Sequence, residues 1–134
     1  MFNALDISTS ALVAQRTRLN VISSNVANQH SIYDAKGNYN PFRRRIPIFA
    51  TGDPQNGNEM GVHVKEIELD EAPFMKKYKP GHPAADADGY VEYPNINSVV
   101  ETVNAMEASR AYQANITAAE TTKTMMSSAM TLLA

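Results

Sequence analysis

The 134-residue chain contains no cysteine and no tryptophan, and its two ends contain neither glycine nor proline. Without cysteine the chain can form no disulfide, no zinc–thiolate site and no thiol nucleophile. All six glycines and all seven prolines lie between Gly37 and Pro94. Because these residues are the strongest breakers of regular structure, we expect uninterrupted helices at both ends and a turn-rich middle.

An excess of positive charge and long apolar runs are also absent. Twelve basic residues against fourteen acidic ones give a net charge of −2, which argues against non-specific nucleic-acid binding. No stretch approaches the roughly 18–20 consecutive apolar residues of a membrane-spanning helix. No positive charge precedes an apolar run near the start, as it does in a secretory signal. We therefore expect a soluble protein without a cleaved signal peptide, which could still be exported by a route that leaves no such mark.

Charge divides the chain at similar points, into residues 1–36, 37–94 and 95–134. The first part carries five charged residues, the last part five and the middle part sixteen. A helix with one face in water normally carries charge on that face, so the charge-poor ends predict helices that are covered on several sides. The sequence thus predicts an α+β fold in which long terminal helices pair as a coiled-coil-like bundle and residues 37–94 form a small, β-rich outer domain.

The first part predicts a single helix that ends near Asn28. Asn3 is the expected N-cap, and Asp6 suits the positive end of the helix dipole. Apolar residues then recur every seven positions, which makes a seam for another helix. The predicted seam residues are Leu5, Leu12, Leu19, Ile22 and Val26.

The last part predicts a helix over residues 98–133, roughly 54 Å long at 1.5 Å per residue. Ser98 and Glu101 match the S-x-x-E capping box, in which each side chain binds a backbone amide at the helix start. A second seam repeats at sevens from Ala105. Its predicted packing residues are Tyr112, Ile116, Ala119, Met126, Met130 and Leu133. The first helix, about 36 Å long by the same rise, can pair with only part of the second, so several turns remain to contact something else.

The other faces of both predicted helices are mostly small or polar. One interpretation is a helical hairpin packed on the chain's own middle part, and the other is that further subunits complete the helices. We prefer the second interpretation because one seam does not explain helix faces that are poor in charge all round. The ends of an isolated monomer should then be frayed, since an amphipathic helix without partners is marginally stable.

The middle part predicts short strands at 39–49, 61–70, 74–78 and 89–93. Pro47 confines the first of them to a sheet edge or a bulge, because proline has no amide proton. In the second strand the apolar alternation changes phase between Val64 and Ile67, as an extra bulge residue would cause. A segment of this size can make only a small core, so we expect it to lean on the helices.

Two clusters in the middle part could carry chemistry. His82, Asp86 and Asp88 offer an imidazole and two carboxylates, as a metal site or a small hydrolase needs, but the same residues are typical of a turn. The arginine run at 43–45 could bind phosphate or a partner's carboxylates, or form a solvated edge. No phosphate-binding loop, H-E-x-x-H or nucleophile-elbow motif is present. The sequence therefore predicts no catalytic residue, no cofactor and no metal, and hence a protein that is not an enzyme.

Residues 11–31, ALVAQRTRLNVISSNVANQHS, resemble the N-terminal signature of flagellar axial proteins, in which a helix ends in an Asn-x-x-Asn pair. Here the pair is Asn25 and Asn28. Further motifs follow in the family's order: YNPFRR at 39–44, GVHV at 61–64, APF at 72–74, YKPGHP at 78–83, GYV at 89–91, YPNIN at 93–97 and ASRAYQAN at 108–115. Over nearly its whole length the chain thus resembles the proximal rod proteins of the bacterial flagellar basal body. It departs from the family pattern at Ala84, where an acidic residue is usual, and at Thr102 and Asn104.

The resemblance implies a structural subunit that is exported unfolded through the flagellar type III apparatus, without a cleaved signal, and that transmits motor torque. Its terminal helices would form the inner tube of a rod that crosses the periplasm. The implied partners are other rod proteins and further copies of the chain in a helical assembly, with MS-ring or export-gate junction proteins as additional contacts; no nucleic acid or small-molecule substrate is implied. Two alternatives stay open: a cytoplasmic helical adaptor or regulatory protein, and a small metal-dependent hydrolase built on His82.

Overall fold

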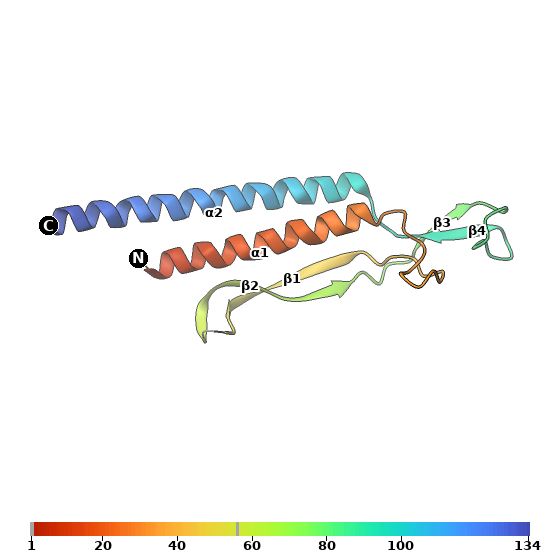
Figure 1. The fold of residues 1–134 in the computed structure, drawn as a ribbon, viewed down its shortest axis with the longest axis horizontal. Helices are drawn as coiled ribbons and strands as arrows, with labels where there is room; N and C mark the ends of the chain where they lie inside the picture. Colours follow the sequence, from red (N-terminus) through yellow and green to blue (C-terminus); the bar gives the residue numbers. More distant parts are fainter. Residues whose placement is uncertain (1, 56) are drawn as a thin grey trace.

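The computed structural model describes residues 2–55 and 57–134. In chain order its elements are helix α1 (Phe2–Ala27), strands β1 (Arg45–Asp53), β2 (Asn58–Leu69), β3 (Met75–Tyr78) and β4 (Tyr90–Tyr93), and helix α2 (Ser98–Leu133). The two helices run antiparallel and side by side along the long axis of the molecule (Figure 1). The predicted α+β fold, with long terminal helices and a β-rich middle, is confirmed.

The middle part forms two separate two-stranded sheets. Strands β1 and β2 make a hairpin that packs along α1 on the side away from α2, whereas β3 and β4 lie beyond the ends of the helices (Figure 1). The Ser10 hydroxyl oxygen accepts a hydrogen bond from the Val62 amide at 3.1 Å, which holds the hairpin to α1. A Cβ on Gly61 would lie 2.7 Å from the Ser10 hydroxyl oxygen, and Gly61 has a φ of +96°, so only glycine fits this approach. Helix α1 is therefore the central layer, covered by α2 on one side and by the hairpin on the other.

Helix α1 ends where the sequence predicts, since Ala27 is its last residue and the Asn28 amide donates to the Ser24 carbonyl at 3.1 Å. The predicted N-cap is wrong. The helix begins at Phe2, so Asn3 lies inside its first turn. Asparagine is favoured at a helix start but does not by itself stop a helix, and no breaker precedes Asn3 in the sequence.

Helix α2 has the predicted bounds, but its cap differs from the prediction. Asn97 is the N-cap, and its Oδ1 accepts hydrogen bonds from the amides of Val99 at 2.9 Å and Val100 at 3.4 Å. Ser98 is the first helical residue, so the predicted capping pair of Ser98 and Glu101 is wrong. Asparagine and serine are equally good caps, and local spacing does not reveal that the Glu101 carboxylate has partners far away in the sequence.

The antiparallel register leaves one end of α2 uncovered. Contacts of Arg18 with Glu107 and of Asn25 with Glu101 fix how the helices are aligned. In that alignment α1 begins opposite the turn of α2 that contains Thr124, and the last turns of α2 extend past α1 (Figure 1). The prediction that the longer helix outruns its partner is confirmed.

Proline lies in β1 at a position that needs no amide proton. Pro47 pairs with Ile67 of β2, and both edges of this two-stranded sheet are outer edges, as predicted. The Asp70 amide donates to the Arg44 carbonyl at 2.8 Å. Because antiparallel pairs alternate between hydrogen-bonded and non-bonded, Pro47 falls at a non-bonded position and its nitrogen faces away from β2.

The predicted bulge in β2 is confirmed. Ile48 pairs with Glu66 and Phe49 with Val64, so Lys65 is the extra residue between them. This insertion explains the change of apolar phase in the sequence, because one extra residue moves all later side chains to the other face.

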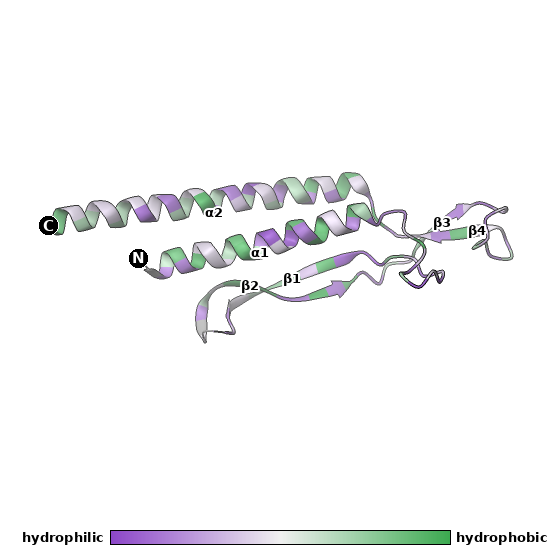
Figure 2. Cartoon of the chain, in the orientation of Figure 1, coloured by the Kyte–Doolittle hydropathy of each residue, from purple (hydrophilic) through white to green (hydrophobic). Residues whose placement is uncertain are grey.

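Apolar residues are spread along both helices among polar ones (Figure 2). In the part of the chain that the structure describes, no helix combines the length and the apolar character needed to cross a membrane. Buried apolar side chains are few: Ala14, Val21, Ile22, Ile32, Val91, Tyr93, Ile96 and Ala108. So small a core leaves much apolar surface on the monomer.

Candidate assembly interface and the junction that supports it

Three segments of the chain meet at Asn25, near the end of α1. Its side chain is buried, its Oδ1 accepts a hydrogen bond from the Arg45 amide at 2.9 Å, and its Nδ2 donates to the Arg45 carbonyl at 2.9 Å. The same Nδ2 donates to Glu101 Oε2 at 3.3 Å. The Asn25 side-chain amide thus forms the two backbone hydrogen bonds with Arg45 that a neighbouring strand would form. Through Glu101 it also links β1 and α1 to α2.

A buried ion pair completes this junction. Glu101 is 1% exposed, and Arg44 Nε donates to its Oε1 at 2.6 Å. Arg44 also lies 3.6 Å from Asp70 Oδ2, just after β2. A carboxylate can be buried at tolerable cost only when it is paired and hydrogen-bonded, and Glu101 meets both conditions. The junction therefore depends on Arg44, which the sequence analysis identified only as part of a basic run.

The neighbouring arginine binds within the chain as well. Arg43 donates to two backbone carbonyls after β2, the closer at 2.8 Å, and its guanidinium lies 4.0 Å from the centre of the Phe74 ring. Both interactions tie the start of β1 to the segment between β2 and β3. Two of the three arginines in the basic run thus bind groups of their own chain, so their presence can be explained without a bound phosphate.

Asn28, the second member of the predicted helix-end pair, organises the turn after α1. Its Nδ2 donates to the Ser24 carbonyl at 2.9 Å, and its Oδ1 accepts from the Ser31 hydroxyl at 3.1 Å. Asn25 and Asn28 therefore have different tasks, because the first joins segments across the fold and the second closes the helix end.

The predicted seam residues of α1 all lie at covered positions. Ile22 is buried, and the others are half-buried: Leu5, Leu12, Leu19 and Val26. On α2 the half-buried seam residues are Tyr112, Ile116, Ala119 and Met126. The predicted seam is therefore placed between helices over the length that α1 covers, while its role in assembly stays a prediction.

Sequence reasoning missed a second row on α2, which also repeats every seven residues. Its members are Glu101, Ala108, Asn115, Thr122 and Ala129, and all of them are buried or half-buried. These residues are small or polar, so a search for apolar repeats passes over them. The repeat itself was the available signal, because small side chains let two helices approach closely.

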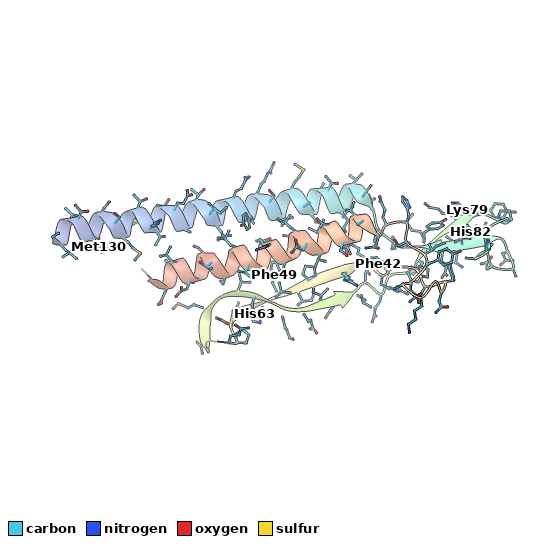
Figure 3. The ribbon with its side chains drawn as sticks, viewed as in Figure 1. Phe42, Phe49, His63, Lys79, His82 and Met130 are labelled. Atoms are coloured by element: carbon cyan, nitrogen blue, oxygen red, sulfur yellow. The ribbon has the colours of Figure 1, made fainter. Side chains whose placement is uncertain are left out.

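The seam continues past the end of α1, where its residues are exposed. Met130 is 69% and Leu133 is 89% exposed, although both lie on the line that carries Tyr112, Ala119 and Met126 (Figure 3). Figure 3 shows Met130 on the part of α2 that extends beyond the described part of α1. The apolar seam of α2 therefore extends beyond α1, and its exposed end is a surface that a second protein can cover.

A second exposed apolar stripe lies at the start of α2. Val99, Val103 and Met106 are spaced by four and three residues, and each is more than half exposed. The buried side chains of Glu101 and Ala108 face α1, so this stripe lies on the opposite face of the helix. The helix therefore has apolar surface on two faces, which fits contact with more than one neighbour.

The His82 cluster forms a turn at the opposite end of the molecule from Met130 (Figure 3). His82 Nδ1 accepts a hydrogen bond from the Ala84 amide at 3.0 Å, and Asp86 Oδ1 accepts from the amides of Asp88 and Tyr90. In the described residues no group of three potential ligands is placed to hold a metal ion. The turn interpretation of these residues is confirmed by their hydrogen bonds.

A pair of variants tests this assignment of the turn. Asp86→Ala removes the acceptor of two amide hydrogen bonds and should cost about 1–3 kcal/mol of unfolding free energy. Asp88→Ala is the matched control, since its carboxylate accepts no hydrogen bond from the described residues, and its change should stay within about 0.5 kcal/mol. Urea unfolding measures both. If Asp88→Ala reduced motility much more than Asp86→Ala, the cluster would have a chemical role beyond forming the turn.

Two family models match the chain, and they cover its two helices. One, described as flagellar basal body rod FlgEFG protein C-terminal, matches residues 87–132, and the other, described as flagella basal body rod protein, matches residues 5–29. Proteins named flagellar basal-body rod protein FlgC are similar over nearly the full length. The one from Salmonella typhimurium is 43% identical over 132 residues, covering 98% of this chain and 97% of the relative. The one from Borreliella burgdorferi is 39% identical over 150 residues, covering 99% and 97%. The one from Aquifex aeolicus is 44% identical over 125 residues, covering 92% and 90%.

Proposed function

The chain belongs to the FlgC family of flagellar basal-body rod proteins, and on that premise we propose that its two terminal helices are the elements through which it assembles. It is a structural subunit of the bacterial flagellar basal-body rod, it assembles with other rod components, and it belongs to a family that is not enzymatic. This assignment decides against the cytoplasmic adaptor and the small hydrolase that the sequence alone left open.

The observation that carries the proposal is the exposed seam at the end of α2. Met130 and Leu133 continue the line of residues that packs on α1, but within the described residues they remain 69% and 89% exposed. Helices that bury one face against each other and leave further apolar stripes exposed need additional neighbours. The proposed neighbours are helices of other rod subunits and of further copies of this chain.

We propose in addition that the subunit transmits torque, and the junction at Asn25 and Glu101 supports this. Hydrogen bonds and an ion pair connect α1, α2 and β1 at one place, so that a load on one element reaches the other two. A rod that rotates as a body requires subunits whose parts do not slide past one another. The hairpin, fixed to α1 at Ser10 and at Asn25, then turns with the helices.

The proposal extends to the route and the surroundings of the chain. Export without a cleaved signal, a position in the part of the rod that spans the periplasm, and contacts with MS-ring or export-gate junction proteins belong to it. They are supported by the family assignment.

Amide hydrogen exchange tests the proposal. In a dilute monomer the amides of residues 126–133 should exchange nearly as fast as in an unfolded chain, because a few helical turns without a partner are unstable. The amides around Asn25, at the junction, should be protected and serve as the internal control. In assembled basal bodies the same terminal amides should become protected. Full protection of residues 126–133 already in the dilute monomer would contradict the proposal.

A further inference from the structure

The two sheets have four outer edges, and the chain blocks the start of the β1 edge, at Arg45 and Pro47. The backbone amide and carbonyl of Arg45 point away from β2, and both are hydrogen-bonded to the side chain of Asn25. The next outward residue is Pro47, which has no amide proton to offer. An added strand would find no ladder of donors and acceptors there, which is how proteins prevent edge-to-edge pairing.

The edge of β4 is sealed in the same manner by different groups. The Tyr39 hydroxyl accepts a hydrogen bond from the Glu92 amide at 2.9 Å and lies 3.3 Å from the Glu92 carbonyl, to which it donates. Asp86 accepts from the Tyr90 amide through its carboxylate at 2.8 Å and donates its own amide to the Tyr90 carbonyl at 2.9 Å. Both outward residues of β4 are therefore fully occupied.

The edge of β3 is open. The Lys79 amide donates to the Gly89 carbonyl at 2.8 Å, so Lys79 and Gly89 form a hydrogen-bonded pair. Because bonded and non-bonded pairs alternate along an antiparallel ladder, the backbone amides and carbonyls of Lys76 and Tyr78 point away from β4. Among the described residues no group hydrogen-bonds to the outward amides and carbonyls of these two residues. All four side chains of β3 are exposed.

The last part of β2 has the other open edge. Arg44 and Asp70 form a backbone hydrogen-bonded pair. By the same alternation, the backbone amides and carbonyls of Ile67 and Leu69 point away from β1. No group in the described part of the chain bonds to their outward amides and carbonyls, and their side chains are 47% and 57% exposed. The earlier part of this strand is hydrogen-bonded to α1, at Val62.

The two open edges are complementary. Each edge has two residues whose backbone amides and carbonyls point outward, separated by one residue whose backbone groups bond to the partner strand. The free donors and acceptors of the two edges therefore have the same spacing. The β3 edge is basic, with Lys76, Lys77 and Lys79 and no acidic residue between positions 75 and 79. The β2 edge is acidic, because Glu66, Glu68 and Glu71 outnumber Lys65, while Asp70 is already paired with Arg44. Opposite charges across an interface select the partner and fix the register.

We propose that the β3 edge of one copy pairs with the β2 edge of the next copy, by strand addition. The two edges do not contact each other within one chain, so pairing must join different chains. A contact between unlike surfaces is heterologous and repeats from copy to copy, which generates rings or helical arrays. The proposal rests on the assembly proposed above and adds a second contact, outside the helices.

Disulfide trapping tests the pairing, and the absence of native cysteine makes any product unambiguous. Cysteine is introduced at Ile67 or Leu69 in one sample and at Lys76 or Tyr78 in another, and the differently tagged chains are mixed in concentrated solution and oxidised. Directly opposed residues in a sheet lie within reach of a disulfide. We expect one combination to give a mixed dimer several-fold above the control, Lys36→Cys, an exposed position outside both edges.

Charge reversal separates specific pairing from random collision. On the β3 partner that carries its cysteine at Tyr78, Lys76→Glu with Lys77→Glu should return trapping to the level of the control, and Glu66→Lys with Glu68→Lys on the β2 partner should restore it. All four side chains are exposed, so the variants should fold as the parent does. Trapping that never exceeds the control, or that ignores both reversals, overturns the inference.

The same cysteine pair on one chain, expressed in the source bacterium, separates this inference from the proposed function. Basal bodies that contain the chain and show interchain β2–β3 disulfides support both. Basal bodies that contain the chain without these disulfides, or with β3 disulfide-bonded or crosslinked to a different protein, overturn the inference alone. Trapping in solution together with absence of the chain from basal bodies overturns the proposed function and leaves the edge contact standing.

Discussion

Arg44→Met is expected to lower the free energy of unfolding by about 3–5 kcal/mol, because it leaves the Glu101 carboxylate buried without a counter-charge. Among the described residues, only the Asn25 amide would remain as a hydrogen-bond partner, at 3.3 Å from the carboxylate. Glu101 is 1% exposed, so its carboxylate depends on these two partners in place of water. Urea unfolding of the monomer, followed by helical circular dichroism, measures the change.

The double variant Arg44→Met with Glu101→Leu should recover most of this loss, because it removes both charges and leaves neither unpaired. Arg18→Met is the matched control. Arg18 also bridges α1 to α2, at 3.5 Å from Glu107, but that glutamate is 68% exposed and the pair should contribute less than about 1 kcal/mol. An Arg44→Met variant no less stable than Arg18→Met would show that the junction does not hold the three segments together.

Ile22→Asp and Met130→Asp should separate folding from assembly. Ile22 is 6% exposed, so Asp at this position replaces apolar packing with a buried carboxylate and should cost about 3 kcal/mol or more, leaving little folded protein. Met130 is exposed on the uncovered end of α2, so its replacement should change the stability of the monomer by no more than about 0.5 kcal/mol.

Motility should nevertheless be lost in both variants, for different reasons. Ile22→Asp fails because the subunit does not fold, whereas Met130→Asp folds but places a charge where a neighbouring helix must pack. Ala87→Asp adds the same charge to an exposed loop far from the helices and should leave motility unchanged. Unfolding curves and swimming assays together distinguish the two causes. Motile cells carrying Met130→Asp would show that the exposed seam is not used.

The sequence predicts those parts of the fold that have local causes. Glycine and proline confined to the middle part predict one uninterrupted helix at each end, and the phase change after Val64 predicts the bulge at Lys65. These features follow from backbone preferences and side-chain period, which a short window of sequence contains.

The sequence does not predict the junction, because its groups come from four distant segments. Glu101 sits three residues after Ser98, as in a capping box, and nothing local distinguishes that spacing from a carboxylate bound by Arg44. Asn25 looks like a helix-end residue, and only the fold shows that it also occupies the backbone of Arg45. Such tertiary partners outweigh local preference and have no signature in a single chain.

The exposed end of α2 was predicted in kind, although not in detail. Counting residues shows that α2 outruns α1, but the alignment of the two helices comes from the contacts of Arg18 and Asn25. With that alignment Met130 and Leu133 fall beyond α1, and Met126 lies at its limit. The seam therefore divides into a folding part and a proposed assembly part.

The most direct test of the proposed assembly surface is the amount of chain in detergent-extracted flagellar basal bodies from cells that express Met130→Asp. The account predicts that the parent chain and Ala87→Asp are present in equal amounts and that Met130→Asp is absent, although it is folded and exported. Met130→Asp at the level of the parent chain would contradict the account.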